Sequence, residues 1–333
     1  ILYQKPGPLG VPESNHLGGI EMAKYIAGRI LLIAPTLVAV ILVIFFILNI
    51  TPGDTATIIL GPNATPEEIA ILEHDLKLDR PFFVRFLSYL GDVLRLDFGR
   101  SYRNNLPVFD EIFAKFPITL KLALFSVLAS MLIGIPVGVI SAVRRFSFID
   151  YSLTVAALFM ASVPAFFLGL ALILIFCLGL GVLPSSGLGA VTSYILPVVT
   201  LALPSSALLA RMTRASMLET MRQDYIRTAK AKGAGKTRII FKHALKPALL
   251  PVVVVLGSNF AAQLGGSVIV ETVFGLPGLG SHILRAIRMK DTPVIMAVAI
   301  LLAVIFKLVM LLVDVIQVNI DPRLRGRFVK REV

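Results

Sequence analysis

Charged side chains are scarce in this chain of 333 residues. Only 16% of the residues are charged, whereas 56% are hydrophobic and the mean hydropathy is +0.86. A soluble domain of this length needs more polar surface than that. The apolar residues also run in long blocks, which is typical of a chain whose solvent is a lipid bilayer. The composition therefore argues against a soluble protein.

Cysteine and histidine are too few to build a reactive or metal-binding centre. The single cysteine, Cys177, cannot form an internal disulfide, and its apolar surroundings predict a small packing residue. The four histidines fall in different segments, with no nucleophile–base pairing and no metal-ligand spacing. We therefore expect no catalytic residue, no metal site and no cofactor bound by this chain.

Six apolar blocks are long enough to cross about 30 Å of hydrocarbon at about 1.5 Å per residue. In the third block, Pro164 predicts a kink. We expect an all-α membrane protein with a single transmembrane domain over residues 22–333. Residues 1–21 are rich in Gly and Pro, and we interpret them as a leader or tag-like segment. The six expected spans cover residues 30–50, 122–143, 152–180, 194–210, 248–270 and 293–313.

The basic residues are unevenly placed, which predicts an orientation in the membrane. Residues 211–246 hold ten Lys or Arg and only two acids, and further basic residues follow the second and sixth blocks. Since basic loops remain in the cytoplasm, we expect the loop 211–247 and both termini there. The near-balanced insertion 51–117 is then extracytoplasmic. This placement explains the net charge of +12 without nucleic acid, which we do not expect as a partner.

The extracytoplasmic insertion carries signals of a small folded unit. Thr65, Pro66 and Glu68 stand where an N-cap, a first helical residue and a reciprocal capping partner are placed in a capping box. A helix is therefore predicted to start at Thr65. A second, weakly amphipathic helix is predicted over residues 82–96.

The loop 211–247 contains a compact sequence of helix signals. Asp224 suits a helix start, Lys230 suits a helix end, and Gly233 suits the left-handed position that stops a helix. A second helical run is predicted over residues 236–246. An apolar strip on the first helix favours burial by a partner protein over the alternative, a solvated basic loop. The strip consists of Tyr225, Ile226 and Ala229.

The residues from Asp224 to Gly233 read Asp-Tyr-Ile-Arg-Thr-Ala-Lys-Ala-Lys-Gly. They resemble the coupling loop of ABC-importer permeases, whose pattern is E-A-A-x-x-x-G. Arg227 replaces the Glu, as is common in the peptide/nickel branch. Residues 25–325 resemble the B-type permease of the dipeptide, oligopeptide and nickel transporters. Further matching segments are residues 52–54, 78–81, 97–99, 271–280 and 321–323.

This resemblance implies the type I ABC-importer permease fold and an ATP-driven import function, with di- or oligopeptides as cargo. It implies a second homologous permease subunit, two cytoplasmic ATPase subunits that use the ATP, and an extracytoplasmic substrate-binding protein. It also implies the bacterial cytoplasmic (inner) membrane as location. The residues implied in ATPase docking are Asp224, Tyr225, Arg227, Thr228, Ala229, Lys232 and Gly233.

The run Gly-Ala-Gly-Lys-Thr at residues 233–237 imitates the end of a phosphate-binding P-loop. The full pattern needs a glycine where Lys230 stands, and a strand where a basic helix is predicted. We therefore expect ATP to bind another polypeptide. The glycine-rich run 275–280 likewise lacks the context of a dinucleotide loop and is predicted to be a turn at the outer end of the fifth span.

Three polar residues within the spans are candidates for the translocation path. Asn259 and Gln263 share one helical face, and Lys307 is expected deep in the sixth span, paired with another helix. Hydrogen bonding between helices is the alternative for the first two. The rival function is an ion-coupled secondary transporter, which needs midplane charges on several spans, and a scaffold without transport is a third possibility.

Overall fold

The computed structural model describes residues 14–50, 55–61, 63–187 and 191–320. The regular secondary structure of this part of the chain is helical apart from one isolated bridge between Arg100 and Pro107. Five of its helices are long and apolar enough to span a membrane, and there are six spans if one bent pair counts as one. The five are α1 (Ser14–Ile50), α5 (Val108–Val143), α8 (Ile195–Thr220), α11 (Leu245–Gly266) and α14 (Thr292–Ile320).

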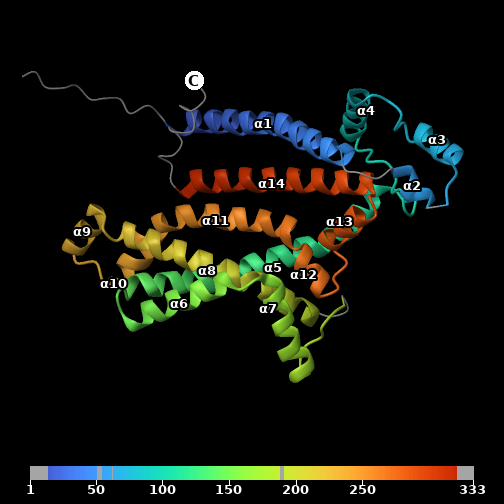
Figure 1. The fold of residues 1–333 in the computed structure, drawn as a ribbon. Helices are drawn as coiled ribbons and strands as arrows, with labels where there is room; N and C mark the ends of the chain where they lie inside the picture. Colours follow the sequence, from blue (N-terminus) through green and yellow to red (C-terminus); the bar gives the residue numbers. More distant parts are fainter. Residues whose placement is uncertain (1–13, 51–54, 62, 188–190, 321–333) are drawn as a thin grey trace, which may run out of the picture.

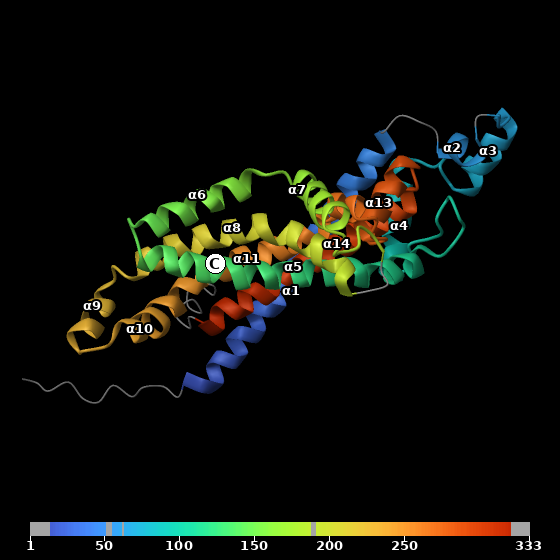
Figure 2. The same cartoon turned by 90° about the horizontal axis from the view of Figure 1, so that it is seen from below.

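The long helices lie along one another in a bundle whose two ends differ (Figures 1 and 2). One end, here called the α9 end, carries α9 (Asp224–Ala231), α10 (Lys236–Arg238) and a π-helical segment, Ile239–Ala244, that leads into α11. The opposite end, here called the α13 end, carries the short helices of the predicted insertion. These are α2 (Thr55–Leu60), α3 (Pro66–Asp75) and α4 (Phe82–Leu94), beside α12 (Val268–Val273) and α13 (Leu279–Arg288).

Helices α5 and α8 pack with almost no space between their backbones. A Cβ added to Gly134 would lie 2.7 Å from the carbonyl oxygen of Ser206, and one added to Gly138 would lie 2.5 Å from that of Ala210. Small residues permit such close approach between membrane helices, which have no hydrophobic drive to associate in lipid. The α5–α8 pair is therefore the structural centre of the bundle.

The third predicted span is broken rather than kinked. Helix α6 (Phe148–Ser162) and the helical segment Ala165–Gly179, which begins with α7 (Ala165–Leu172), meet at an angle of 99°. Val163 is extended because the ring of Pro164 disfavours helical geometry at the preceding residue. Pro164 then becomes the N-cap of α7.

Two helices continue beyond the predicted spans. Helix α5 begins at Val108, within the predicted insertion 51–117, and α8 continues past residue 210 to Thr220. Hydropathy marks where the chain is apolar, but a helix ends where packing and caps stop it. Near the end of α8, Thr213 and Met217 are fully buried although the local sequence is polar.

The insertion at the α13 end folds as predicted around Thr65. The Thr65 backbone N–H donates to Glu68 Oε2 at 2.8 Å, and the Glu68 N–H donates back to Thr65 Oγ1 at 3.3 Å. This capping box holds the pKa of Glu68 below its usual value, chiefly through the backbone hydrogen bond from Thr65. The second predicted helix is α4, which packs Phe82 and Phe86 against Phe45 of α1.

Candidate functional site

Helix α9 forms at the predicted place and stops at the predicted glycine. Its last turn is closed by the Lys232 N–H, which donates to the Thr228 carbonyl at 3.0 Å. Gly233 then adopts a φ of +80°, a left-handed conformation that side chains with a Cβ rarely take. The Ala234 N–H donates to the Ala229 carbonyl at 3.1 Å and completes the stop.

The apolar strip of α9 does not face outward as a whole, and the expectation that a partner buries Ile226 is wrong. Ile226 is fully buried inside this chain, in a cluster that includes Met217 of α8 and Ile239 and Ala244 at the entrance to α11. Burial of such a side chain contributes about 1.5–3 kcal/mol. Ile226 therefore fixes how α9 is oriented against the ends of two long helices.

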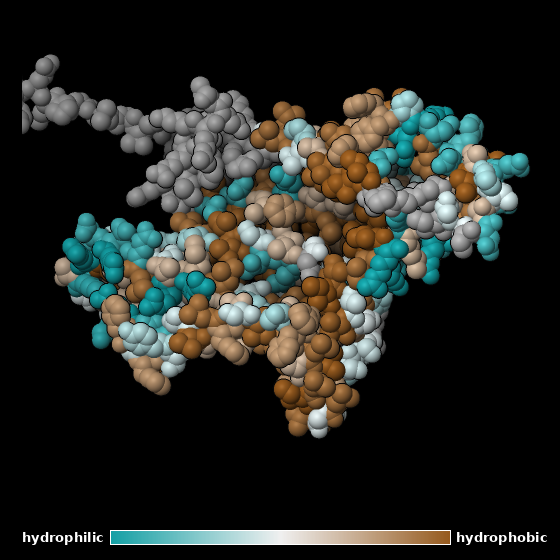
Figure 3. Space-filling view, in the orientation of Figure 1, coloured by the Kyte–Doolittle hydropathy of each residue, from teal (hydrophilic) through white to brown (hydrophobic). Residues whose placement is uncertain are grey.

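What remains outside is a polar face with one aromatic side chain. Tyr225 is 46% exposed, and Asp224 forms an ion pair of 3.6 Å with Arg227 in which both side chains are largely in solvent. Figure 3 shows hydrophilic residues gathered over α9 and α10. Of the seven residues predicted to dock an ATPase, six are exposed and Ala229 is half-buried. The structure thus brings the predicted docking residues onto one short element with a defined orientation.

The polar residues of the spans do not form one cluster. Gln263 of α11 donates from Nε2 to Ser205 Oγ of α8 at 3.1 Å, which matches the alternative of hydrogen bonding between helices. Asn259 is half-buried, and its Nδ2 has no hydrogen-bond partner in the described residues. Lys307 lines a separate cavity of about 390 Å³ between α1, α11 and α14, to which Thr36 contributes. Within the described ranges Lys307 forms no hydrogen bond or ion pair, so its predicted pairing with another helix is not seen.

A buried carboxylate organises the α13 end. Glu271 is fully buried; its Oε1 accepts from Thr119 Oγ1 at 2.7 Å and from Ser267 Oγ at 2.9 Å, and its Oε2 accepts from the Ser281 N–H at 2.8 Å. A Cβ on Gly278 would lie 2.5 Å from this carboxylate. The glycine-rich run 275–280 therefore begins with a turn, as predicted, and this turn packs around Glu271. The role of Glu271 escaped the sequence analysis, although an acid beside that run was a signal.

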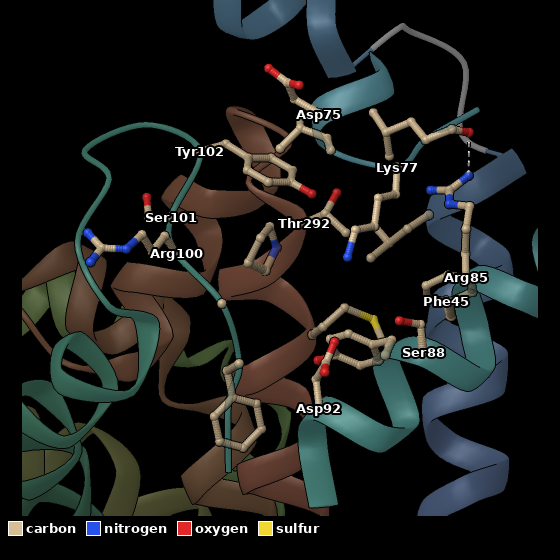
Figure 4. A pocket seen from close by; sticks show the side chains of 18 of the residues that line it. Phe45, Asp75, Lys77, Arg85, Ser88, Asp92, Arg100, Ser101, Tyr102 and Thr292 are labelled. Carbon is tan, nitrogen blue, oxygen red and sulfur yellow. Dashed lines mark hydrogen bonds between the residues drawn. The ribbon is translucent and has the colours of Figure 1, made fainter. Parts of the chain in front are cut away.

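A pocket of about 790 Å³, lined by both polar and apolar side chains, opens at the same end, between the end of α1, helices α3 and α4, and the start of α14. Figure 4 shows Lys77, Tyr102 and Thr292 gathered around it. Arg85 donates to the Leu78 carbonyl at 3.4 Å along its wall. The buried Tyr89 hydroxyl in this wall lacks a hydrogen-bond partner among the described residues, and burial raises the pKa of Tyr89 well above its usual value. The pocket therefore offers donors, acceptors and charges of both signs.

Comparison with known families gives a direct match for nearly the whole chain. Residues 134–326 match the model described as "Binding-protein-dependent transport system inner membrane component", and residues 22–123 match the N-terminal model of the same transport-system membrane components. The chain belongs to this family. It is therefore a permease subunit of an ABC importer, in the branch that carries peptide-class substrates.

Two curated relatives are similar over 304 residues, which is 91% of this chain and 99% of each relative. Both are called "Glutathione transport system permease protein GsiC"; the protein of Salmonella typhimurium strain LT2 is 40% identical and that of Escherichia coli K12 is 39% identical. Among solved structures, an inward-facing form of the MetNI methionine ABC transporter superposes with a TM-score of 0.54. It is 23% identical and covers 64% of this chain and 98% of that chain.

A second solved structure, an amino acid ABC transporter with histidines, gives a TM-score of 0.51 at 18% identity, covering 63% of this chain and 94% of that chain. These likenesses confirm the type I importer fold. Family membership also confirms that the permease is not itself an enzyme and that ATP is hydrolysed by partner ATPase subunits. It decides against the ion-coupled transporter and the scaffold. The chain is a multi-pass membrane protein homologous to bacterial inner-membrane transporters.

Proposed function

We propose that this chain forms one half of the transmembrane pathway of an importer for di- or oligopeptides, together with a second homologous permease. The feature that supports this most is α9, with its exposed polar face on one side and buried Ile226 on the other. Two cytoplasmic ATPases would each receive such a helix. The basic loop 211–247 and both termini would then lie in the cytoplasm of a bacterium, and the α13 end outside.

The physical logic of coupling follows from the two faces of α9. An ATPase that grips Tyr225 and Thr228 would move the whole helix, because Ile226 ties it to the cluster at the ends of α8 and α11. A packed apolar contact transmits force without stretching, since interiors are dense and poorly compressible. Closure of the ATPase pair would therefore displace the long helices rather than bend a loose loop.

The α13 end suits the extracytoplasmic binding protein. Its pocket presents Lys77 and Arg100 beside Asp75 and Asp92, so it carries both signs of charge. Complementary charges across an interface mainly set specificity and the rate of association. The permease–binding-protein contact would accordingly weaken as salt is raised. The cargo would then pass the candidate path residues Asn259, Gln263 and Lys307.

The experiment for docking is copurification of the assembled complex with its ATPase after Tyr225→Ala together with Gly233→Pro. Proline fixes φ near −65°, which is incompatible with the φ of +80° at Gly233, so the helix stop is lost. We expect the ATPase to dissociate and transport to stop. The control is Tyr151→Ala, a tyrosine of α6 that is 61% exposed. A complex and a transport rate equal to those of the unmodified protein would refute the proposal.

The experiment for cargo is uptake by the complete system in proteoliposomes. Radiolabelled glutathione, trialanine and glycine are the probes, each presented with the cognate binding protein. We expect ATP-dependent uptake of at least one of the two tripeptides and none of glycine. Uptake of neither tripeptide would refute a tripeptide cargo while leaving the docking experiment unaffected.

A further inference from the structure

A buried ion pair joins α6 to α8 near the α9 end, away from the docking face. Arg214 of α8 donates from Nε to Asp150 Oδ1 at 2.7 Å and from Nη2 to Oδ2 at 2.8 Å. The Asp150 side chain is 3% exposed, and that of Arg214 is 29% exposed. Such a two-pronged contact fixes both distance and orientation, because the guanidinium plane matches the carboxylate.

Asp150 also organises the turn between α5 and α6. The hydroxyl of Ser141, near the end of α5, donates to its Oδ1, and the Phe146 N–H donates to its Oδ2 at 2.9 Å. Phe146 is held in a left-handed conformation, with a φ of +62°. The Ser147 hydroxyl caps α6 by accepting from the Asp150 N–H at 3.3 Å. One carboxylate therefore ties the end of α5, the turn, the start of α6 and α8 together.

Helix α6 buries few of its side chains completely. Its only buried residues are Asp150 and Ala157, while Val155 is 64% exposed and Phe159 is 63% exposed. By contrast, α5 and α8 are in backbone contact at Gly134 and Gly138. In lipid, helices associate through van der Waals packing and interhelical hydrogen bonds, without a hydrophobic driving force. The ion pair therefore adds a directional, charged contact to the packing between α6 and α8.

The Asp150–Arg214 ion pair lies between α9 and the α13 end. Arg214 lies on the same part of α8 as Met217, which packs in one cluster with Ile226 of α9. In the other direction, α6 leads through its bend into α7. A Cβ added to Gly169 of α7 would lie 3.2 Å from the ring of Phe274, beside the turn around Glu271. The contacts are thus continuous from α9 to that turn.

We propose that Asp150 is a positioning residue for energy coupling. Paired with Arg214, it makes α6 and α7 follow α8 when the ATPase moves α9, so that the turn around Glu271 at the far end responds. This rests on the proposed docking of α9. A carboxylate with only a packing role would stabilise the fold, but its loss would not change how much transport each ATP produces.

The test uses the complete complex in proteoliposomes, with Asp150→Asn as the variant and labelled glutathione and trialanine as probes. Asparagine keeps the shape and loses the charge. We expect ATP hydrolysis to continue and the number of ATP molecules consumed per imported tripeptide to rise about tenfold, a typical size for coupling between sites. Arg214→Lys, which keeps the charge but loses the fork, should give a smaller rise. Arg211→Gln, an exposed arginine of the same helix, is the control.

A second readout follows the helices themselves. Spin labels on Val155→Cys of α6 and Leu208→Cys of α8, in a Cys177→Ser background, report the distance between α6 and α8. With Asp150 present, the distance should be the same without nucleotide and in the vanadate-trapped state. With Asp150→Asn, it should differ between the two states, because α6 no longer follows α8. This difference is independent of the cargo.

The outcomes separate coupling from folding and from docking. An Asp150→Asn complex with unchanged ATP consumption per tripeptide and an unchanged distance in both states would overturn the proposal. The proposal would also be overturned if Asp150→Asn changed the α6–α8 distance equally in both nucleotide states while the ATP consumed per tripeptide stayed normal. That result would mean that the ion pair has only a structural role. If Asp150→Asn does not assemble, Arg214→Lys decides by the same two readouts. Failure of α9 docking appears separately, as normal ATPase copurification after Tyr225→Ala plus Gly233→Pro.

Discussion

Helix α9 and the turn around Glu271, at opposite ends of the bundle, are each centred on a different kind of buried side chain. At the α9 end, an apolar anchor, Ile226, is fully buried and leaves the polar face of its helix outside. At the α13 end, a carboxylate, Glu271, is fully buried and accepts three hydrogen bonds, from Thr119, Ser267 and Ser281. Apolar packing is non-directional, whereas hydrogen bonds fix angles. The orientation of α9 therefore rests on packing, whereas the arrangement of the turn around Glu271 rests on hydrogen bonds of defined geometry.

The largest effect should come from breaking the α13 end. Glu271→Ala removes the acceptor of Thr119 Oγ1, Ser267 Oγ and the Ser281 N–H, and leaves these donors buried. We expect a loss of about 3 kcal/mol or more in the free energy of unfolding. The measurement is SDS titration in mixed micelles. Glu67→Ala, an exposed position of α3, serves as the control, and equal stability of the two variants would contradict the account.

The second-largest effect is expected at the α9 end, from Ile226→Ala. Shortening a buried isoleucine destabilises by about 2–5 kcal/mol, and a short surface helix that can shift inward should lie at the lower end of that range. We expect α9 to lose its fixed orientation, with faster proteolysis after Lys230 and Lys232. Ile71→Ala, at a position that is 64% exposed, is the matched control. Unchanged proteolysis of α9 would mean that Ile226 is not the anchor.

A smaller effect is expected at the capping box of the insertion. Thr65→Ala removes the side chain that accepts from the Glu68 N–H, and the loss should be about 1 kcal/mol. The measurement is hydrogen exchange of the α3 amides, which should speed up while the α9 amides do not change. Thr65→Ser, which keeps the hydroxyl, should behave like the unmodified chain. Faster exchange in α9 would contradict the independence of the two ends.

The smallest effect is a pH dependence confined to the α13 end. Burial, together with the positive charges of Lys115 and Arg285, holds the pKa of His282 below its usual value. Glu111, whose Oε2 lies 3.4 Å from His282 Nε2, has the opposite effect on this pKa. The unfolded chain then binds the proton more readily than the folded one. Stability should therefore rise as pH rises towards 6.5, the ordinary value, and level off above it. His282→Gln should flatten this rise in SDS titrations at pH 5–8; an unchanged slope would contradict it.

The sequence was sufficient for features that rest on neighbouring residues. The capping box at Thr65 and the stop at Gly233 involve contacts within a few positions, so their patterns are visible locally. The features that escaped prediction join distant segments. Asp150 meets Arg214, and Glu271 meets Thr119, only after the helices have packed. No periodicity reveals which helices will be neighbours.

The burial of Ile226 was mispredicted for the same reason. On its own helix it belongs to an apolar strip with no visible cover, and the cover comes from α8 and the entrance to α11. The docking residues remain a prediction; the structure shows Ile226 buried and Tyr225 and Thr228 exposed. Tertiary contacts thus decided which half of the strip is available to a partner.

The central claim, that an ATPase grips the exposed face of α9, is tested most directly by labelling Tyr225→Cys in a Cys177→Ser background. A water-soluble maleimide should label this position readily in the isolated permease, where the residue is 46% exposed. In the complete complex the account predicts strong protection, reversed when the ATPase is stripped away. Equally rapid labelling with and without the ATPase would contradict it.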